Sequence, residues 1–192
     1  MGLLLLGLLI FLSVHSVRIV AEDWRSATIA RIGPARWKGL YSLLSLLGFA
    51  LIVWGYGLAR QQPIALWDPR LWTRHLASLL TLASFVLLAA AYVPGNGIKA
   101  RVHHPMVLGV KVWALAHLLA NGTLADAVLF GAFLVWSVLD FRAARGRDRA
   151  AGTRYPVGTT PATLAALAGG VVAWAVFAFW AHGWLIGVRP FG

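Results

Sequence analysis

The chain has 192 residues, of which 60% are hydrophobic and only 12% are charged, and its formal net charge is +11. This balance favours a membrane protein over a soluble domain, and the absence of cysteine excludes disulfides, thiolate zinc sites, iron–sulfur clusters and covalently attached c-type haem. Nucleic acid is excluded as a partner, because the basic residues lie in short segments between apolar runs and no DNA- or RNA-binding motif accompanies them.

Six apolar runs are long enough, or nearly so, to cross about 30 Å of hydrocarbon at about 1.5 Å per residue. In chain order they are Gly2–Val20, Trp37–Ala59, Arg74–Val93, Pro105–Asn121, Ala125–Phe141 and Pro161–Val188. Glycine- and proline-containing segments separate most of them, and a tight helical hairpin joins the short fourth and fifth runs. With no internal repeat or long linker, the sequence predicts a single all-α domain over residues 1–192, an integral membrane bundle of about six transmembrane helices.

Basic residues are concentrated in alternate connections between these runs. The first, third and fifth connections hold most of them, which by the positive-inside bias places these connections in the cytoplasm and both termini outside. The lipid bilayer, including its anionic headgroups, is therefore an expected partner. The basic residues of the first, third and fifth connections are Arg18, Arg25, Arg31, Arg36, Lys38, Lys99, Arg101, Arg142, Arg145, Arg147, Arg149 and Arg154.

Two histidines lie deep within predicted spans, His15 in the first and His117 in the fourth. An ionisable side chain at membrane depth is costly and is by default a candidate for function. Counted from the outer surface, His15 lies at a depth of about 20 Å and His117 at about 12 Å. This difference is within the usual error of predicted helix ends, so the two form the best-matched pair of histidines in the chain.

The pair suits one kind of metal site better than others. Two histidines, without cysteine or an intramembrane carboxylate, are too few for a closed zinc site. Haem iron needs only two axial ligands, because the porphyrin supplies the rest. Noncovalent haem, held by two histidines or by one with an open position, is therefore one reading. The other is that each imidazole only hydrogen-bonds a serine or a carbonyl of a neighbouring helix.

Other side chains are placed to support such a cofactor. Three basic residues near the headgroup level either meet haem propionates or extend to lipid phosphate. They are Arg18, Lys38 and Lys111. His104 lies nearly in line with Lys111 on the fourth helix, and it either contacts the cofactor or belongs to the solvated start of that helix. Trp113 lies one turn before His117 on the same face, where it packs against a flat ligand or fills the core.

The segment from Gly97-Ile98 through His103-His104-Pro105 to His117 and Asn121-Gly122 resembles the signature of the NnrU family of integral membrane proteins. The first helix with His15-Ser16 and the stretch from Arg36 to Ser45 are also similar, so the likeness covers nearly the whole chain. This family includes the plant and cyanobacterial 15-cis-zeta-carotene isomerases, in which haem b held by two histidines isomerises a cis double bond of a polyene when the iron is reduced.

The resemblance implies haem b ligated by His15 and His117, which are then also the catalytic residues, and an apolar polyene as substrate. Those isomerases exchange one histidine for a cysteine three residues before the second ligand, whereas this chain has Ala114 there, so the likeness does not extend to that exchange. Bacterial members are associated with denitrification and nitric oxide metabolism. A second hypothesis is therefore a non-enzymatic haem protein of a bacterial inner membrane that serves a redox partner.

A third hypothesis comes from a different class of protein. The spacing of Gly97-Ile98, His103-His104-Pro105 and Gly109 is similar to the Arg-His-Pro block of membrane methyltransferases that act on isoprenylcysteine or phospholipid amines. Those enzymes have arginine where this chain has His103. They also carry paired glutamates further along, whereas residues 140–155 contain no glutamate.

Overall fold

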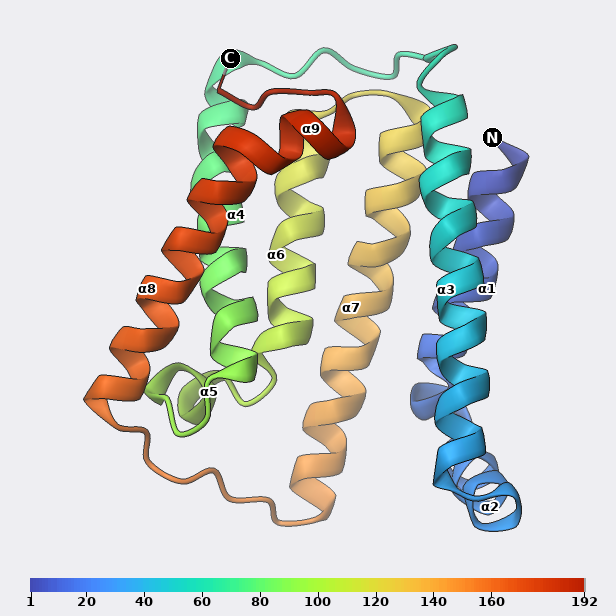
Figure 1. The fold of residues 1–192 in the computed structure, drawn as a ribbon, viewed down its shortest axis with the longest axis vertical. Helices are drawn as coiled ribbons and strands as arrows, with labels where there is room; N and C mark the ends of the chain where they lie inside the picture. The colour runs from blue at the N-terminus through green and yellow to red at the C-terminus, as the bar shows by residue number, and fades with distance from the viewer. Residues whose placement is uncertain (192) are drawn as a thin grey trace. The chain divides into compact units, whose positions relative to one another are not determined.

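A computed structural model describes residues 1–191, and these residues form helices and two isolated β-bridges but no strand (Figure 1). Five helical spans are long and apolar enough to cross a membrane, and Pro105–Ala120 is a shorter apolar helix. The predicted fold class, an all-α integral membrane bundle of about six transmembrane helices, is confirmed. The elements are α1 (Gly2–Val20), α2 (Glu22–Ile32), α3 (Pro34–Ala59), α4 (Leu71–Tyr92), α5 (Gly97–Val102), α6 (Pro105–Ala120), α7 (Leu124–Ala150), α8 (Thr160–Val176), the π-helical η1 (Phe177–Ala181) and α9 (His182–Ile186).

The described chain divides into two compact units. The first unit comprises Met1–Pro69 and Asn121–Ala144, and the second comprises Arg70–Ala120 and Arg145–Gly192. The long helix α7 therefore begins in the first unit and ends in the second. The expectation of a single domain over residues 1–192 stays a prediction.

In the first unit, α1 and α3 lie side by side with their backbones in close approach (Figure 1). A Cβ atom added to Gly48 of α3 would stand 2.8 Å from the backbone nitrogen of Phe11, closer than real Cβ atoms come. Gly7 of α1 meets the backbone of α3 in the same way. Small residues at the interface are a usual means of packing transmembrane helices. This contact brings the turn that holds His15 against α3.

A hydrogen-bonded corner attaches the start of α7 to the end of α3. The Tyr56 hydroxyl of α3 donates to Asp126 Oδ1 of α7 at 2.5 Å, and the other carboxylate oxygen accepts from the backbone N–H of Thr123 at 2.9 Å. Asp126 is only 5% exposed. A buried carboxylate is stable when it is fully hydrogen-bonded, so this corner fixes α7 beside α3 within the first unit.

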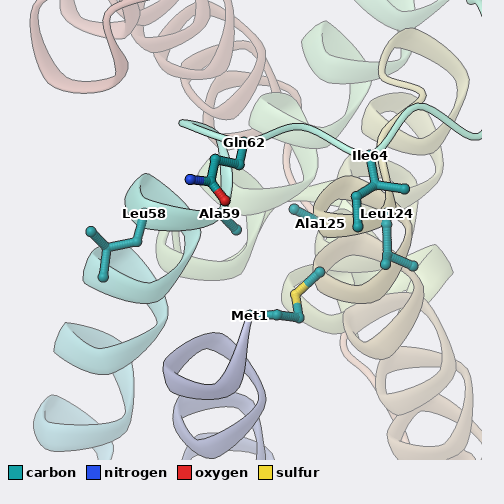
Figure 2. A pocket seen from close by; sticks show the side chains of 7 residues that line it. All are labelled: Met1, Leu58, Ala59, Gln62, Ile64, Leu124 and Ala125. Atoms are coloured by element: carbon teal, nitrogen blue, oxygen red, sulfur yellow. The ribbon is translucent and has the colours of Figure 1, made fainter.

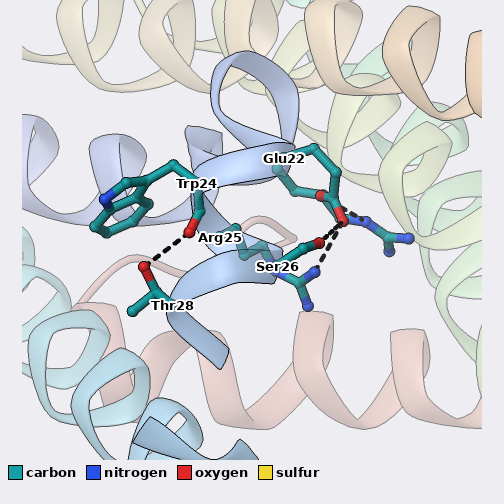
Figure 3. A network of polar contacts seen from close by, with 6 residues as sticks. Glu22, Trp24, Arg25, Ser26 and Thr28 are labelled. Carbon is teal, nitrogen blue, oxygen red and sulfur yellow. Dashed lines mark hydrogen bonds and ion pairs between the residues drawn. The ribbon is translucent and has the colours of Figure 1, made fainter. Parts of the chain in front are cut away.

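The short helix α2 was not predicted from hydropathy, because it is polar. Its first turn is acidic and its last turn basic, which complements the helix dipole. Figure 3 shows that Glu22 accepts hydrogen bonds from Arg25 at 3.0 Å and Ser26 at 3.4 Å, while the Thr28 hydroxyl donates to the backbone one turn earlier. Arg18 at the end of α1 lies 3.5 Å from Glu22, so α2 is fastened to α1.

In the second unit, α4 packs against both α6 and α8 (Figure 1). The buried Ser84 hydroxyl of α4 donates to the carbonyl of Gly109 on α6 at 2.8 Å. On the other side of α4, the indole N–H of Trp174 on α8 donates to the Thr81 hydroxyl at 3.1 Å. Hydrogen bonds of this kind are a common link between transmembrane helices. The bond from Ser84 fixes α6, the helix that carries His117, against α4.

Most predicted spans agree with the observed helices to within a few residues, and α7 shows the largest difference. It continues to Ala150, whereas the prediction ended at Phe141. The added turns are rich in arginine and alanine, which form helices well but lie outside an apolar run. The short helix α5 was not predicted either. The last span occupies Thr160–Ile186, with a π-helical turn in its second half, whereas Pro161–Val188 was predicted.

Candidate functional site

His15 lies on α1, half-buried, with its imidazole fixed by its own helix. Nδ1 lies 2.7 Å from the carbonyl oxygen of Phe11, one turn earlier. A carbonyl oxygen only accepts hydrogen bonds, so Nδ1 must carry the proton. In the neutral imidazole the lone pair then lies on Nε2, the nitrogen that is left to bind a metal.

Aromatic rings from three helices surround the His15 imidazole. The Phe11 ring stacks on it with centroids 4.0 Å apart and an interplanar angle of 22°. Tyr41 of α3 lies 5.2 Å away, and Trp136 of α7 meets it edge-on at 6.0 Å. The carboxylate of Asp140, one turn after Trp136, is close enough to act electrostatically on His15. His15 therefore has an aromatic environment with one acidic group at its side.

His117 on α6 has the same local arrangement. Its Nδ1 lies 2.9 Å from the carbonyl oxygen of Trp113, one turn earlier, and the two rings are 5.0 Å apart. Ala114 and Ala116 beside it are fully buried, whereas His117 itself is half-buried. The neutral imidazole again has its proton on Nδ1 and its lone pair on Nε2.

The two histidines thus share one device: an aromatic residue one turn earlier and an Nδ1 proton held by that residue's carbonyl. A second hydrogen bond from the other ring nitrogen is the usual way in which proteins orient a metal-binding imidazole and fix its tautomer. His15 belongs to the first unit and His117 to the second. Their convergence on one ligand stays a prediction.

The residues around His15 fit a haem better than a metal ion held by protein alone. Among residues 1–191, no group of three or more histidine, cysteine, aspartate or glutamate residues could hold a metal ion. Haem requires an imidazole nitrogen, apolar walls and hydrogen-bond donors for its carboxylates. Next to His15, the buried Nε1–H of Trp136 has no hydrogen-bond partner within the described chain. This donor and the flanking rings are features that a haem would use.

The predicted supporting residues lie in different surroundings. Arg18 is exposed at the end of α1, where it pairs with Glu22, and Lys38 is exposed near the start of α3. Lys111 lies half-buried on α6, two turns before His117. Trp113 supplies the carbonyl that holds His117. Contacts of Arg18, Lys38 and Lys111 with a cofactor stay predictions.

His104 and its neighbour His103 belong to a polar cluster in the second unit. His104 Nε2 donates to Asp148 Oδ2 at 2.8 Å, and the Tyr155 hydroxyl donates to the same oxygen at 3.0 Å. Arg145 donates to His103 Nδ1, and the His103 ring stacks on Tyr155 at 4.1 Å. These contacts connect the partly exposed start of α6 to the end of α7 and the segment that follows it. The predicted role of His104 toward a cofactor stays a prediction.

The same cluster shifts the pKa of one tyrosine. Burial raises the pKa of Tyr155, and the hydrogen bond to Asp148 and the charge of that carboxylate raise it further. The guanidinium of Arg145 acts in the opposite direction. Tyr155 therefore remains a hydrogen-bond donor to Asp148 at neutral pH.

His103 also has a strained backbone. Its φ is 68° and its ψ is −49°, and the N–H of His104 donates to the Val102 carbonyl at 2.8 Å across it. This is a γ-turn with positive φ, a conformation that costs free energy for residues other than glycine. The turn separates α5 from α6, which begins at Pro105 as predicted. The side-chain contacts of His103 and His104 hold this conformation.

A cavity and a groove lie in the first unit. A cavity of about 200 Å³ is enclosed by Met1, the end of α3 and the start of α7; Figure 2 shows its lining side chains, among them Gln62 and Leu124. It lies at the opposite end of α1 from His15. A longer apolar groove of about 530 Å³ runs along α1 beside α7. Its lining residues are Leu5, Leu8, Leu9, Leu12, Ser13, Ser16, Val20, Val128 and Ala132.

Sequence reasoning did not single out Phe11, Trp136, Asp148 or Tyr155. The aromatic residue one turn before each histidine was a usable signal, because Phe11–His15 and Trp113–His117 have the same spacing. The other three residues are far in sequence from the histidines that they approach. Only the packing of helices brings them close, so no local pattern could have indicated them.

The model of the NnrU protein family matches residues 3–190. No curated protein and no solved structure matches the chain. The match covers both units and includes both intramembrane histidines.

Proposed function

The chain belongs to the NnrU family, and on this premise we propose that it is a membrane protein that binds haem b, with His15 and His117 as the axial ligands. The observation that supports this most is the arrangement common to the two side chains. Each has its Nδ1 proton directed at a carbonyl of its own helix, at 2.7 Å and 2.9 Å. Each neutral ring then offers Nε2 to a metal.

Haem is preferred to other metal groups because of the ligands the chain offers. It has no cysteine, and two imidazoles are sufficient only where a macrocycle supplies the remaining ligands. Phe11, Tyr41 and Trp136 provide the flat, apolar surroundings that a porphyrin needs beside His15. Arg18, Lys38 and Lys111 are proposed to meet its propionates.

We further propose that the protein uses this haem for a redox-dependent cis–trans isomerisation of an apolar polyene of the zeta-carotene type. When bound, the haem supplies a reducible iron as the reactive centre. The chain's own part is to hold the polyene. The apolar groove along α1, which contains Ser16 next to His15, supports this proposal because a linear hydrocarbon would enter it from the bilayer.

Absorbance spectroscopy of the purified protein tests both steps. The expected reduced-minus-oxidised spectrum is that of haem b with two imidazole ligands, and a protein that takes up no haem would contradict the proposal. The reduced holoprotein is then incubated with zeta-carotene or a similar cis polyene. Isomerisation only under reducing conditions supports the enzyme, whereas haem without isomerisation rejects this second step.

A non-enzymatic haem protein is the alternative that this last outcome would favour. The observation behind it is that both histidines are held alike by their helices, so neither is marked as the labile ligand. An iron saturated by two firm imidazoles suits electron transfer better than catalysis. The partner would then be a redox protein of denitrification or nitric oxide metabolism.

One observation favours a membrane methyltransferase as a further candidate. His103 and His104, from the block that resembles those enzymes, contact Arg145, Asp148 and Tyr155, which lie in the region where the enzymes carry paired glutamates. Asp148 offers a carboxylate in that place. Binding of S-adenosylmethionine, measured by isothermal titration calorimetry, would support this candidate, and its absence would reject it.

A further inference from the structure

The indole N–H of Trp136 is a buried donor for which residues 1–191 supply no acceptor. Trp136 lies on α7, and among the described residues its Nε1 has no hydrogen-bond partner although it is shielded from solvent. Indole nitrogen is a donor only, so the missing partner must be an acceptor. A buried unsatisfied donor costs free energy, and in native proteins such atoms usually bond a ligand or water.

The position of this donor connects it with His15. The Trp136 ring meets the imidazole edge-on, at an interplanar angle of 87°. Phe11, which stacks on His15, also contacts Phe133 of α7 at 5.8 Å, so α7 covers this side of the imidazole along about one turn. The carbonyl of Phe11, an acceptor close to His15, already binds the imidazole. The unpaired indole N–H therefore belongs to a ring that packs directly against the His15 imidazole.

We propose that Trp136 Nε1–H donates a hydrogen bond to a carboxylate of the haem bound at His15, and so positions the macrocycle. This inference rests on the proposed function. The rim of haem b carries methyl, vinyl and propionate groups, and only the propionates are strong acceptors. A charge-assisted bond in surroundings of low polarity is stronger than one between neutral groups.

Charged groups of both signs lie near His15: the Asp140 carboxylate is one turn after Trp136 on α7, and Arg18 lies at the end of α1. Arg18 follows His15 by three residues, which places it on the same side of α1 one turn nearer the helix end. Its guanidinium would balance the negative charge of a haem carboxylate, as it balances the charge of Glu22, whose Oε2 lies 3.5 Å from Arg18 Nε. Trp136 would orient the haem carboxylate through a single N–H, whereas the exposed Arg18 would contribute only its positive charge. Trp136 is thus a positioning residue, because it acts on the haem rim and leaves ligation to His15.

The test compares two haems in the full-length protein. Apoprotein in detergent is titrated with haem b and with haem b dimethyl ester, which has no carboxylate, and binding is followed by absorbance. The substitution Trp136→Phe keeps an aromatic ring but removes the N–H. It is expected to weaken binding of haem b about tenfold and to leave the affinity for the ester unchanged. Trp174→Phe is the matched control, because that indole already bonds Thr81.

Each outcome is decisive. An equal loss for both haems would show that Trp136 only supports the fold, and no loss for either would show that its N–H is not used; both overturn the inference. The wild-type protein provides a further test without any substitution, because equal affinity for haem b and its dimethyl ester would also overturn the inference. A wild-type protein that binds neither haem contradicts the proposed function instead. Trp136→His, which restores an N–H, is expected to recover part of the affinity for haem b.

Discussion

Two pairs of histidines in this chain differ in their hydrogen-bond partners. His15 and His117 lie within transmembrane helices, and the Nδ1–H of each donates a hydrogen bond to a backbone carbonyl of its own helix. His103 and His104 lie between α5 and α6, where they bond charged side chains. In the first pair the backbone carbonyl accepts the Nδ1 proton and the lone pair of the neutral ring lies on Nε2, whereas in the second pair Arg145 occupies the lone pair of His103 and Asp148 accepts a hydrogen bond from His104. The first arrangement is the one proposed to prepare a metal ligand, and the second connects the turn between α5 and α6 to α7.

The largest difference is expected when one histidine from each pair is removed. His15→Ala is expected to lose most of the bound haem, because the iron loses an axial ligand. His104→Ala is expected to keep it. The haem-to-protein ratio of the two purified variants, from the pyridine haemochrome assay, checks this. Equal haem content in the His15→Ala and His104→Ala variants would contradict the proposed difference between the two pairs of histidines.

The cluster around His104 should instead determine stability. Asp148 accepts from both His104 and Tyr155, so Asp148→Asn is expected to lower the free energy of unfolding by about 1–3 kcal/mol without altering the haem spectrum. Thermal unfolding followed by circular dichroism measures the change. Asp68→Asn, at an exposed position, is the control and should have no effect. A changed haem spectrum in the Asp148 variant would mean that the cluster belongs to the haem site.

The ring that stacks on His15 should have a smaller effect on the haem. Phe11→Leu leaves the hydrogen-bonding carbonyl in place but removes the stacked ring, and it is expected to weaken haem binding by about 0.5–1.5 kcal/mol. Titration of the apoprotein with haem b measures this. Phe179→Leu, on an exposed ring of the second unit, is the control. An effect as large as that of His15→Ala would indicate that Phe11 supports the fold of α1 itself.

The smallest effect is expected from Tyr155, and it depends on pH. Since burial and Asp148 raise its pKa above the ordinary value of 10.0, the contribution of Tyr155 to stability is complete below that value. It is lost as the pH rises through the raised pKa. Difference absorbance between wild type and Tyr155→Phe should therefore show a tyrosine that ionises later than an exposed one. Ionisation at or below the ordinary value would contradict the buried hydrogen bond.

The sequence was sufficient for the fold class and for the approximate ends of most spans, because long apolar runs determine both. It did not reveal α2, since the helix from Glu22 to Ile32 is polar and is stabilised by its own charges. The extension of α7 to Ala150 was missed for a similar reason. Hydropathy indicates segments that contact lipid, whereas α2 and the last turns of α7 are helical but polar.

For the candidate site, the sequence indicated the two intramembrane histidines but not what surrounds them. Both histidines lie inside long apolar runs, which made them candidates, and counting depth along each helix predicted that they form a pair. The approach of Trp136 to His15 depends on the glycine contacts of α1 with α3 and on the Tyr56–Asp126 corner that fixes α7. Those are contacts between distant segments, and a single sequence carries no record of them.

Electron paramagnetic resonance of the ferric protein tests most directly whether both intramembrane histidines hold the same iron. The wild-type protein is expected to give the low-spin signal of iron with two imidazole ligands. His15→Ala and His117→Ala should each abolish this signal, and added imidazole should restore it. A wild-type signal that persists unchanged in either variant would contradict ligation by that histidine, and with it the central claim.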